Sequence, residues 1–168
     1  MDENKAAFAA LSEQLSGPRL PAWEELPDLE LYMDQVLSLA ERWLGAEGKG
    51  LTASMVNNYV KLGVVPPPVK KRYSRAHLAT LLMVCLLKPV LPIASVQALL
   101  SAALAEAPLE AVYARFRAEY EQAGARVLEA ARALQGPGAD GVLRAALQAG
   151  AEQAMALRLL SLLRGEER

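Results

Sequence analysis

Alanine and leucine dominate this chain and restrict the folds open to it. The 168 residues include 31 alanines and 30 leucines but a single isoleucine, Ile93. Alanine and leucine have high helix propensities, whereas strands favour β-branched and aromatic residues. The composition therefore predicts a mainly α-helical protein and excludes a β-sandwich or a β-barrel. The length suits one compact domain, or a small domain with an extension.

The charges are distributed unevenly along the chain. The overall net charge is −1. Residues 1–47 have a net charge of −7, and residues 106–168 have a net charge of −1. The segment between them, 48–105, has a net charge of +7 and contains no Asp or Glu. A long segment with bases and no acids favours contact with a polyanion. We therefore expect the middle third of the chain to contain a binding surface.

Several other classes of protein are not expected. Cys85 lies in an apolar run and has no second cysteine to pair with, so we expect a buried thiol. His77 is expected at the surface, and a single Cys and a single His predict no metal site. The carboxylates of residues 24–34 have no His, metal ligand or Gly-rich loop beside them, so we expect neither enzymatic activity nor a cofactor. No signal peptide is visible, and the longest apolar run, 78–87, covers about half a bilayer. A cytoplasmic protein without membrane contact is therefore expected.

Glycines and prolines divide the chain into segments with helical spacing of apolar residues. The expected helices cover residues 2–16, 28–44, 53–62, 75–87, 94–105, 108–134 and 139–163. Short apolar pairs around a proline run predict a small two-stranded hairpin within 64–74. We expect three parts: an N-terminal helix and connector (1–27), a central domain (28–105) and a C-terminal helical region (106–168).

The expected helix 53–62 carries an unusual polar face. Thr52 precedes it as a helix cap, and Ser54, Asn57, Asn58 and Lys61 follow the i, i+3, i+4, i+7 spacing of one helical face. We call these four residues the polar stripe. Ser, Asn and Lys side chains hydrogen-bond to bases and phosphates. An ordinary solvated face is the alternative interpretation.

The cations Lys70, Lys71 and Arg72 follow the proline run 66–68. They strengthen the interpretation of the polar stripe as part of a nucleic-acid-binding surface. A short helix after a turn, followed by a cationic hairpin, is typical of a winged helix-turn-helix. In that arrangement the polar stripe enters the major groove and the cations contact phosphates. Tyr59 and Tyr73 are expected mainly in the core, with the hydroxyl of Tyr59 at a phosphate. The predicted DNA-binding residues are Thr52, Ser54, Asn57, Asn58, Tyr59, Lys61, Lys70, Lys71, Arg72, Tyr73 and Arg75.

Residues 51–100 resemble the DNA-binding domain of the MerR family of bacterial regulators. The resemblance is carried by these pieces: Leu51-Thr52, Tyr59, Gly63, Val64-Val65-Pro66, Arg72-Tyr73-Ser74 and the segment Ile93 to Leu100. Asn57 and Asn58 depart from the family, which has Arg-Tyr there. The segments 31–36, 55–61 and 68–74 are also similar to an uncharacterised bacterial family of unknown function with MerR-like character. The resemblance implies a MerR-like winged helix-turn-helix with a small β wing, extended by N- and C-terminal helices.

The two long C-terminal helices are expected to form a dimer interface. MerR-like regulators dimerise through a helix in this position, and both helices are rich in apolar residues. Pairing of 108–134 with 139–163 within one chain is the alternative. The sequence leaves open whether a small apolar effector binds between the helices. The predicted function is a dimeric, duplex-DNA-binding transcriptional regulator; the alternative is a protein-interaction module that kept the fold and lost DNA binding.

Overall fold

The computed structural model of the chain describes residues 10, 19–45, 48–134 and 138–165 and is mainly helical. The elements of these residues are η1 (Trp23–Glu25), α2 (Met33–Leu44), α3 (Ala53–Lys61), α4 (Arg75–Leu87), α5 (Ile93–Glu106), α6 (Leu109–Ala133) and α7 (Ala139–Arg164). Extended pairing in the described residues is limited to isolated bridges. The mainly helical class predicted from composition is confirmed. The expected helix 2–16 lies outside the described residues, apart from Ala10.

Helices α3 to α7 begin and end within one residue of the expected positions, but the prediction for α2 was wrong at its start. The helix begins at Met33 rather than at Asp28. The Gln35 side chain accepts a hydrogen bond from the Tyr32 backbone N–H at 2.9 Å and so caps the helix there. The preceding residue, Leu31, exchanges two backbone hydrogen bonds of 2.8 Å with Tyr73. This long-range bridge competes with helix formation and holds residues 28–31 outside α2.

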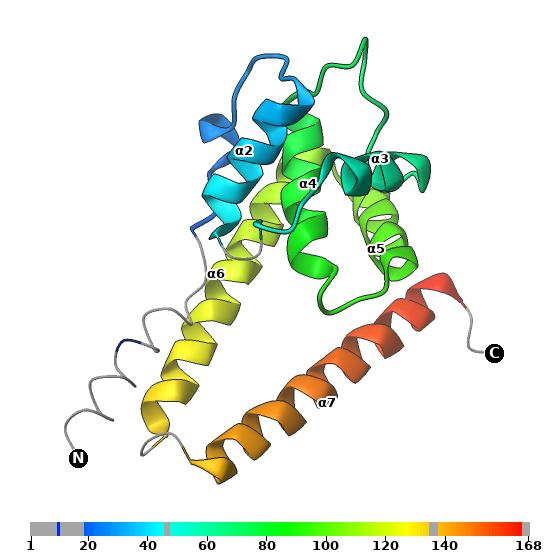
Figure 1. Cartoon of the computed structure of the whole chain (residues 1–168). Helices are drawn as coiled ribbons and strands as arrows, with labels where there is room; N and C mark the ends of the chain where they lie inside the picture. The colour runs from blue at the N-terminus through cyan, green and yellow to red at the C-terminus, as the bar shows by residue number, and fades with distance from the viewer. Residues whose placement is uncertain (1–9, 11–18, 46–47, 135–137, 166–168) are drawn as a thin grey trace.

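Helix α4 lies at the centre of the core, with α2 and α6 packed against it (Figure 1). Every residue from His77 to Val84 is buried. A helix buried on all sides must be apolar all round, which explains the run of apolar residues noted in the sequence. Cys85 follows this run and is half-buried. Burial raises the pKa of its thiol to about 11, which lowers the fraction of reactive thiolate.

The connector before α2 packs against the first turns of α6. Tyr113 of α6 is fully buried, and its hydroxyl donates a hydrogen bond of 2.9 Å to the carbonyl of Pro21. The Trp23 ring lies 6.2 Å from the Tyr113 ring, centroid to centroid. The core therefore includes residues from the connector and from α6 as well as from the central domain expected at 28–105.

Helix α7 does not pair with α6 along its length. The two helices diverge from their connection, and α7 packs against α5 instead (Figure 1). Gln153 donates a 2.6 Å hydrogen bond to the Val90 carbonyl, and Leu160 is buried. The alternative of an intramolecular pair of long helices was therefore wrong. Apolar side chains on the first half of α7, including Leu143 and Leu147, stay exposed in the single chain.

Among the helices of the described ranges, none combines the length and the apolar character needed to span a bilayer.

Replacing Gly48 by alanine should destabilise the protein. A Cβ at this position would lie 2.7 Å from the Ala40 carbonyl oxygen and 2.8 Å from the Glu41 Cα, both on the backbone of α2. Relieving such an overlap requires a backbone shift, which costs about 1–3 kcal/mol. Urea unfolding should show this loss for G48A, whereas G50A is the matched control because a Cβ at Gly50 meets nothing within 4 Å. Equal stability of the two variants would contradict this account of the 48–50 turn.

Replacing Tyr113 by phenylalanine should destabilise the protein by about 1–2 kcal/mol at pH 8, since the buried Pro21 carbonyl loses its donor. Burial raises the pKa of the Tyr113 hydroxyl from 10.0 to about 12. Between these values the unfolded chain loses this proton while the folded chain keeps it, so wild-type stability falls as the pH rises. Urea titrations at pH 8 to 12 should therefore show the gap between wild type and Y113F narrowing above pH 10. A gap that is constant with pH would refute the assignment.

Candidate nucleic-acid interface

Helix α3 presents the polar stripe to solvent and its apolar face to the core. Ser54, Asn57, Asn58 and Lys61 are all exposed, whereas Val56 is buried. This division follows from the helical spacing that the sequence predicted. The polar stripe therefore offers one hydroxyl, two amides and one ammonium group along a single side of a helix.

The two ends of α3 are fixed by polar contacts. The Thr52 hydroxyl oxygen accepts a hydrogen bond from the Met55 N–H at 3.2 Å, so the predicted cap is confirmed. At the other end, Gln97 of α5 donates to the Leu62 carbonyl at 2.8 Å. Gly63 then ends the helix with a φ of +72°, a conformation that glycine adopts at little cost. These contacts hold α3 on α5 and set the direction of the polar stripe.

A two-residue turn places Lys70 and Lys71 at the tip of the segment between α3 and α4. Val69 and Arg72 exchange backbone hydrogen bonds of 3.1 and 2.9 Å, and the two lysines between them have φ values of +50° and +62°. We call residues 69–72 the basic turn. Positive φ at both central positions is the geometry of the tightest hairpin turns, which normally use Asn-Gly. Two lysines in this backbone are strained, at a cost of about 1–3 kcal/mol each.

Arg72, the last residue of the basic turn, and Arg75, at the start of α4, both have partners in the segment that precedes α2. The Arg72 guanidinium lies 3.7 Å from the centre of the Tyr32 ring. Arg75 donates through Nε to the Leu26 carbonyl at 3.1 Å and lies 3.8 Å from the Asp28 carboxylate. Arg75 therefore fastens the connector to the start of α4. Its predicted role in contacting DNA competes with this structural role.

Tyr59 and Tyr73 belong to the core, each with about 3% of its surface exposed. The Tyr59 hydroxyl is itself buried, so the predicted contact of this hydroxyl with a phosphate was wrong. Tyr73 packs edge-on against His77, with 5.5 Å between ring centres. Burial raises the pKa of the Tyr73 hydroxyl above its ordinary value of 10.0.

His77 was expected at the surface, but only 7% of it is exposed. Its Nδ1 accepts the Ser74 backbone N–H at 3.0 Å, which caps α4. With Nδ1 acting as acceptor, the proton of the neutral ring is on Nε2, which donates to the Pro67 carbonyl at 3.2 Å. His77 thereby ties the proline run to α4. The i, i+3 spacing of Ser74 and His77 was the available sequence signal, although a capping box normally has Glu or Gln at that position.

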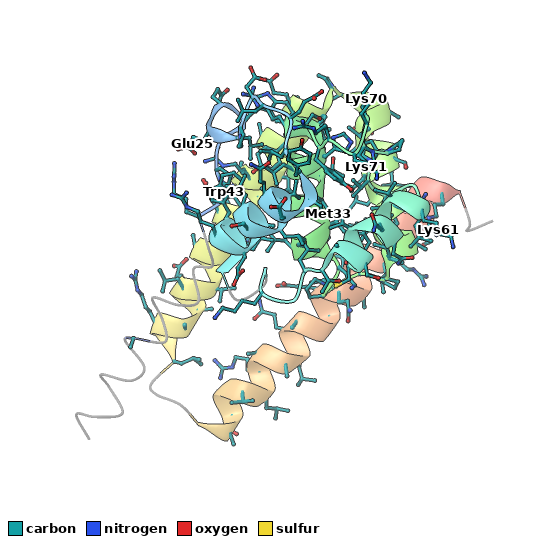
Figure 2. The ribbon with its side chains drawn as sticks, turned by 45° about the horizontal axis from the view of Figure 1, so that its top comes forward. Glu25, Met33, Trp43, Lys61, Lys70 and Lys71 are labelled. Carbon is teal, nitrogen blue, oxygen red and sulfur yellow. The ribbon has the colours of Figure 1, made fainter. Side chains whose placement is uncertain are left out.

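The cations of the basic turn are not neutralised by carboxylates of the described residues. Across the acid-free stretch 48–105, Arg75 with Asp28 is the one ion pair found in the described part of the chain. In Figure 2, Lys61, Lys70 and Lys71 lie toward the same side of the molecule, and Glu25 lies on the other side. The polar stripe and the basic turn thus face solvent with unpaired lysines. No group of three or more His, Cys, Asp or Glu side chains that could hold a metal is present within the described ranges.

Comparison with known proteins identifies the family of the chain but no activity. No curated protein and no solved structure matches it. Residues 21–116, more than half of the sequence, match the family described as Domain of unknown function (DUF1836). This match includes η1, the polar stripe, the basic turn and the first turns of α6. The chain is therefore a member of the DUF1836 family.

Proposed function

We propose that this protein binds duplex DNA as a transcriptional regulator of MerR-like type. The observation that carries the proposal is the basic turn: two exposed lysines in strained backbone, without an ion-pair partner among the described residues, on the same side of the molecule as Lys61 of the polar stripe (Figure 2). A residue keeps a rarely populated backbone conformation only where the surrounding structure holds it there. Such residues are concentrated at functional sites. A turn selected for stability alone would carry Asn-Gly.

The two surfaces suit different parts of a duplex. Ammonium groups on a protruding turn release counterions from phosphates and supply affinity without sequence preference. The amides of Asn57 and Asn58 can pair with an adenine edge in the major groove, and Lys61 can pair with guanine. In this division of roles, the polar stripe selects the sequence and the basic turn supplies most of the salt-dependent affinity.

The proposal rests on these surfaces rather than on a helix-turn-helix geometry. Helix α2 ends at Leu44 and α3 begins at Ala53, so their connection is longer than the three or four residues usual in that motif. The paired segments around Tyr73 are bridges rather than the strands of a wing. Lys70 and Lys71 therefore support DNA binding more strongly than the resemblance to the MerR family does.

Replacing the two lysines of the basic turn by Asn-Gly should separate DNA binding from stability. The double variant K70N/K71G relieves the strained backbone, so its unfolding free energy should rise by about 1 kcal/mol. It also removes two phosphate contacts, so the slope of log affinity against log salt should fall by about 2. Fluorescence anisotropy with random and genomic duplexes measures the affinity, and urea unfolding measures the stability.

The matched control removes two exposed cations from α6, in the variant R126Q/R132Q. It should bind DNA like the wild type. A wild type that fails to bind duplex DNA at low salt would reject the proposed function and favour the alternative, a protein-interaction module with the same fold. Binding that is insensitive to salt, or unaffected in K70N/K71G, would reject the role of the basic turn.

We also propose that two copies associate through α7. Val142, Leu143 and Leu147 are 71%, 59% and 67% exposed near the start of this helix. Adjacent exposed apolar side chains of this kind mark interaction surfaces, and DNA-binding helix modules commonly read two half-sites as dimers.

Light scattering should accordingly find a dimer at micromolar concentration, and L143E/L147E should convert it to a monomer because charges cannot be buried in an apolar interface. Q148E adds one charge to the same helix and should stay dimeric. A monomeric wild type would contradict the proposal.

A further inference from the structure

The backbone register around the basic turn places Tyr32 opposite Arg72. Leu31 is bridged to Tyr73 in antiparallel register. The next residue of the first segment, Tyr32, therefore lies opposite the preceding residue of the second segment, Arg72. Successive side chains of an extended chain point to opposite faces, and Leu31 and Tyr73 are buried. Tyr32 and Arg72 consequently share the outer face. A second bridge, from Arg72 to Val69, closes the basic turn, so one residue belongs to both pairs.

The Arg72 guanidinium packs against the face of the Tyr32 ring. Its central carbon is 3.7 Å from the ring centre, which is the contact distance of two flat groups. An N–H pointing at the ring would hold this carbon farther away. Arginine stacks on aromatic rings in this manner, and its in-plane N–H groups then remain available to acceptors. Within the described ranges, Arg72 has no hydrogen-bond acceptor for its side chain and no ion-pair partner.

The same stack attaches the strained end of the basic turn to the segment before α2. Lys70 and Lys71 have φ values of +50° and +62°, which residues other than glycine keep only where surrounding contacts hold them. Both lysines are exposed at the tip, so the holding contacts must lie at the base of the turn. Arg72 is at that base. Tyr32, in turn, is fixed by the hydrogen bond of its N–H to Gln35 at the start of α2.

We propose that Tyr32 is a positioning residue for phosphate binding by the basic turn. Its ring orients Arg72 so that two N–H groups of the guanidinium reach two oxygens of one DNA phosphate. A guanidinium suits such a bidentate contact, whereas a lysine acts as a point charge. Tyr32 lies outside the surface predicted from the sequence. The inference rests on the proposed function for its ligand, but the hold of Tyr32 on the turn is testable without DNA.

The variant Y32L removes the ring without removing a charge. It should weaken duplex binding about five- to tenfold at low salt in fluorescence anisotropy. The slope of log affinity against log salt should also fall by about 1, because the phosphate contact of Arg72 is lost. Y32F keeps the ring and is the matched control, so it should bind like the wild type. Half of the Tyr32 surface is exposed, so the variants should fold.

The variant R72K tests the partner of the stack. It keeps the positive charge but loses the flat face, so it should lose most of the same affinity as Y32L. The double variant Y32L/R72K should bind no more weakly than the weaker of the two single variants, because both changes remove one shared interaction. Losses that add up in the double variant would contradict the role of the stack.

A double-mutant cycle tests the hold on the turn without DNA. In the wild-type background, K70N/K71G relieves the strain and should lower the unfolding equilibrium constant about fivefold in urea titrations. In Y32L the turn has already relaxed, so the same change should lower that constant less than about twofold. In Y32F the effect should again be about fivefold.

The outcomes separate this inference from the proposed function. An unchanged salt slope in Y32L, or an equal effect of K70N/K71G in all three backgrounds, would overturn the inference even if the wild type binds DNA. A wild type that fails to bind duplex DNA would reject the proposed function and the phosphate contact together. A non-additive cycle in that case would support the hold of Tyr32 on the turn alone.

Discussion

The burial of α4 on all sides is the constraint on which the rest of the structure depends. A helix with apolar residues around its whole circumference is stable only when other elements cover each side. Helices α2 and α6 provide part of this cover, and the connector packs on α6 through Tyr113 and Trp23. Because α4 cannot shift without exposing apolar surface, its first turn is a rigid attachment point. The basic turn precedes the start of this helix, and residues at its end line a cavity together with α3.

The start of α4 shows how a polar network positions the basic turn. His77 bonds to Ser74 and Pro67, and Arg75 bonds to Leu26. These contacts join the proline run, the helix terminus and the connector. The neighbouring cations therefore have separate roles: Arg75 secures the connector, Arg72 packs on Tyr32, and Lys70 and Lys71 form no ion pair within the described ranges. A run of similar charges in a sequence does not reveal this division, since it depends on which side chains meet a partner.

The two sides of helix α3 have different surroundings. Its outer side carries the polar stripe, and its inner side carries Tyr59 in the cavity wall. The contact of Gln97 with the Leu62 carbonyl holds the end of this helix to α5.

Local chemistry determined much of this protein from the sequence alone. Alanine and leucine specify helices through their propensity, glycine and proline end them, and helical spacing places the polar stripe on the exposed side of α3. These rules act over a few residues, so five helices were predicted to within one residue at each end. These local rules were sufficient to predict the mainly helical class and the exposure of the polar stripe.

Contacts between distant residues decided the rest. The late start of α2 depends on the bridge of Leu31 with Tyr73, and the burial of His77 depends on the Pro67 carbonyl. The divergence of α7 from α6 depends on packing against α5. The cavity beside Tyr59 combines residues more than thirty positions apart. Such features depend on contacts that form only when the chain folds. Local sequence patterns do not specify which distant residues come into contact. The sequence thus determined the helices and their polar faces, whereas only the tertiary structure decided which cations meet a partner among the described residues, because ion pairs and packing join residues far apart in the chain.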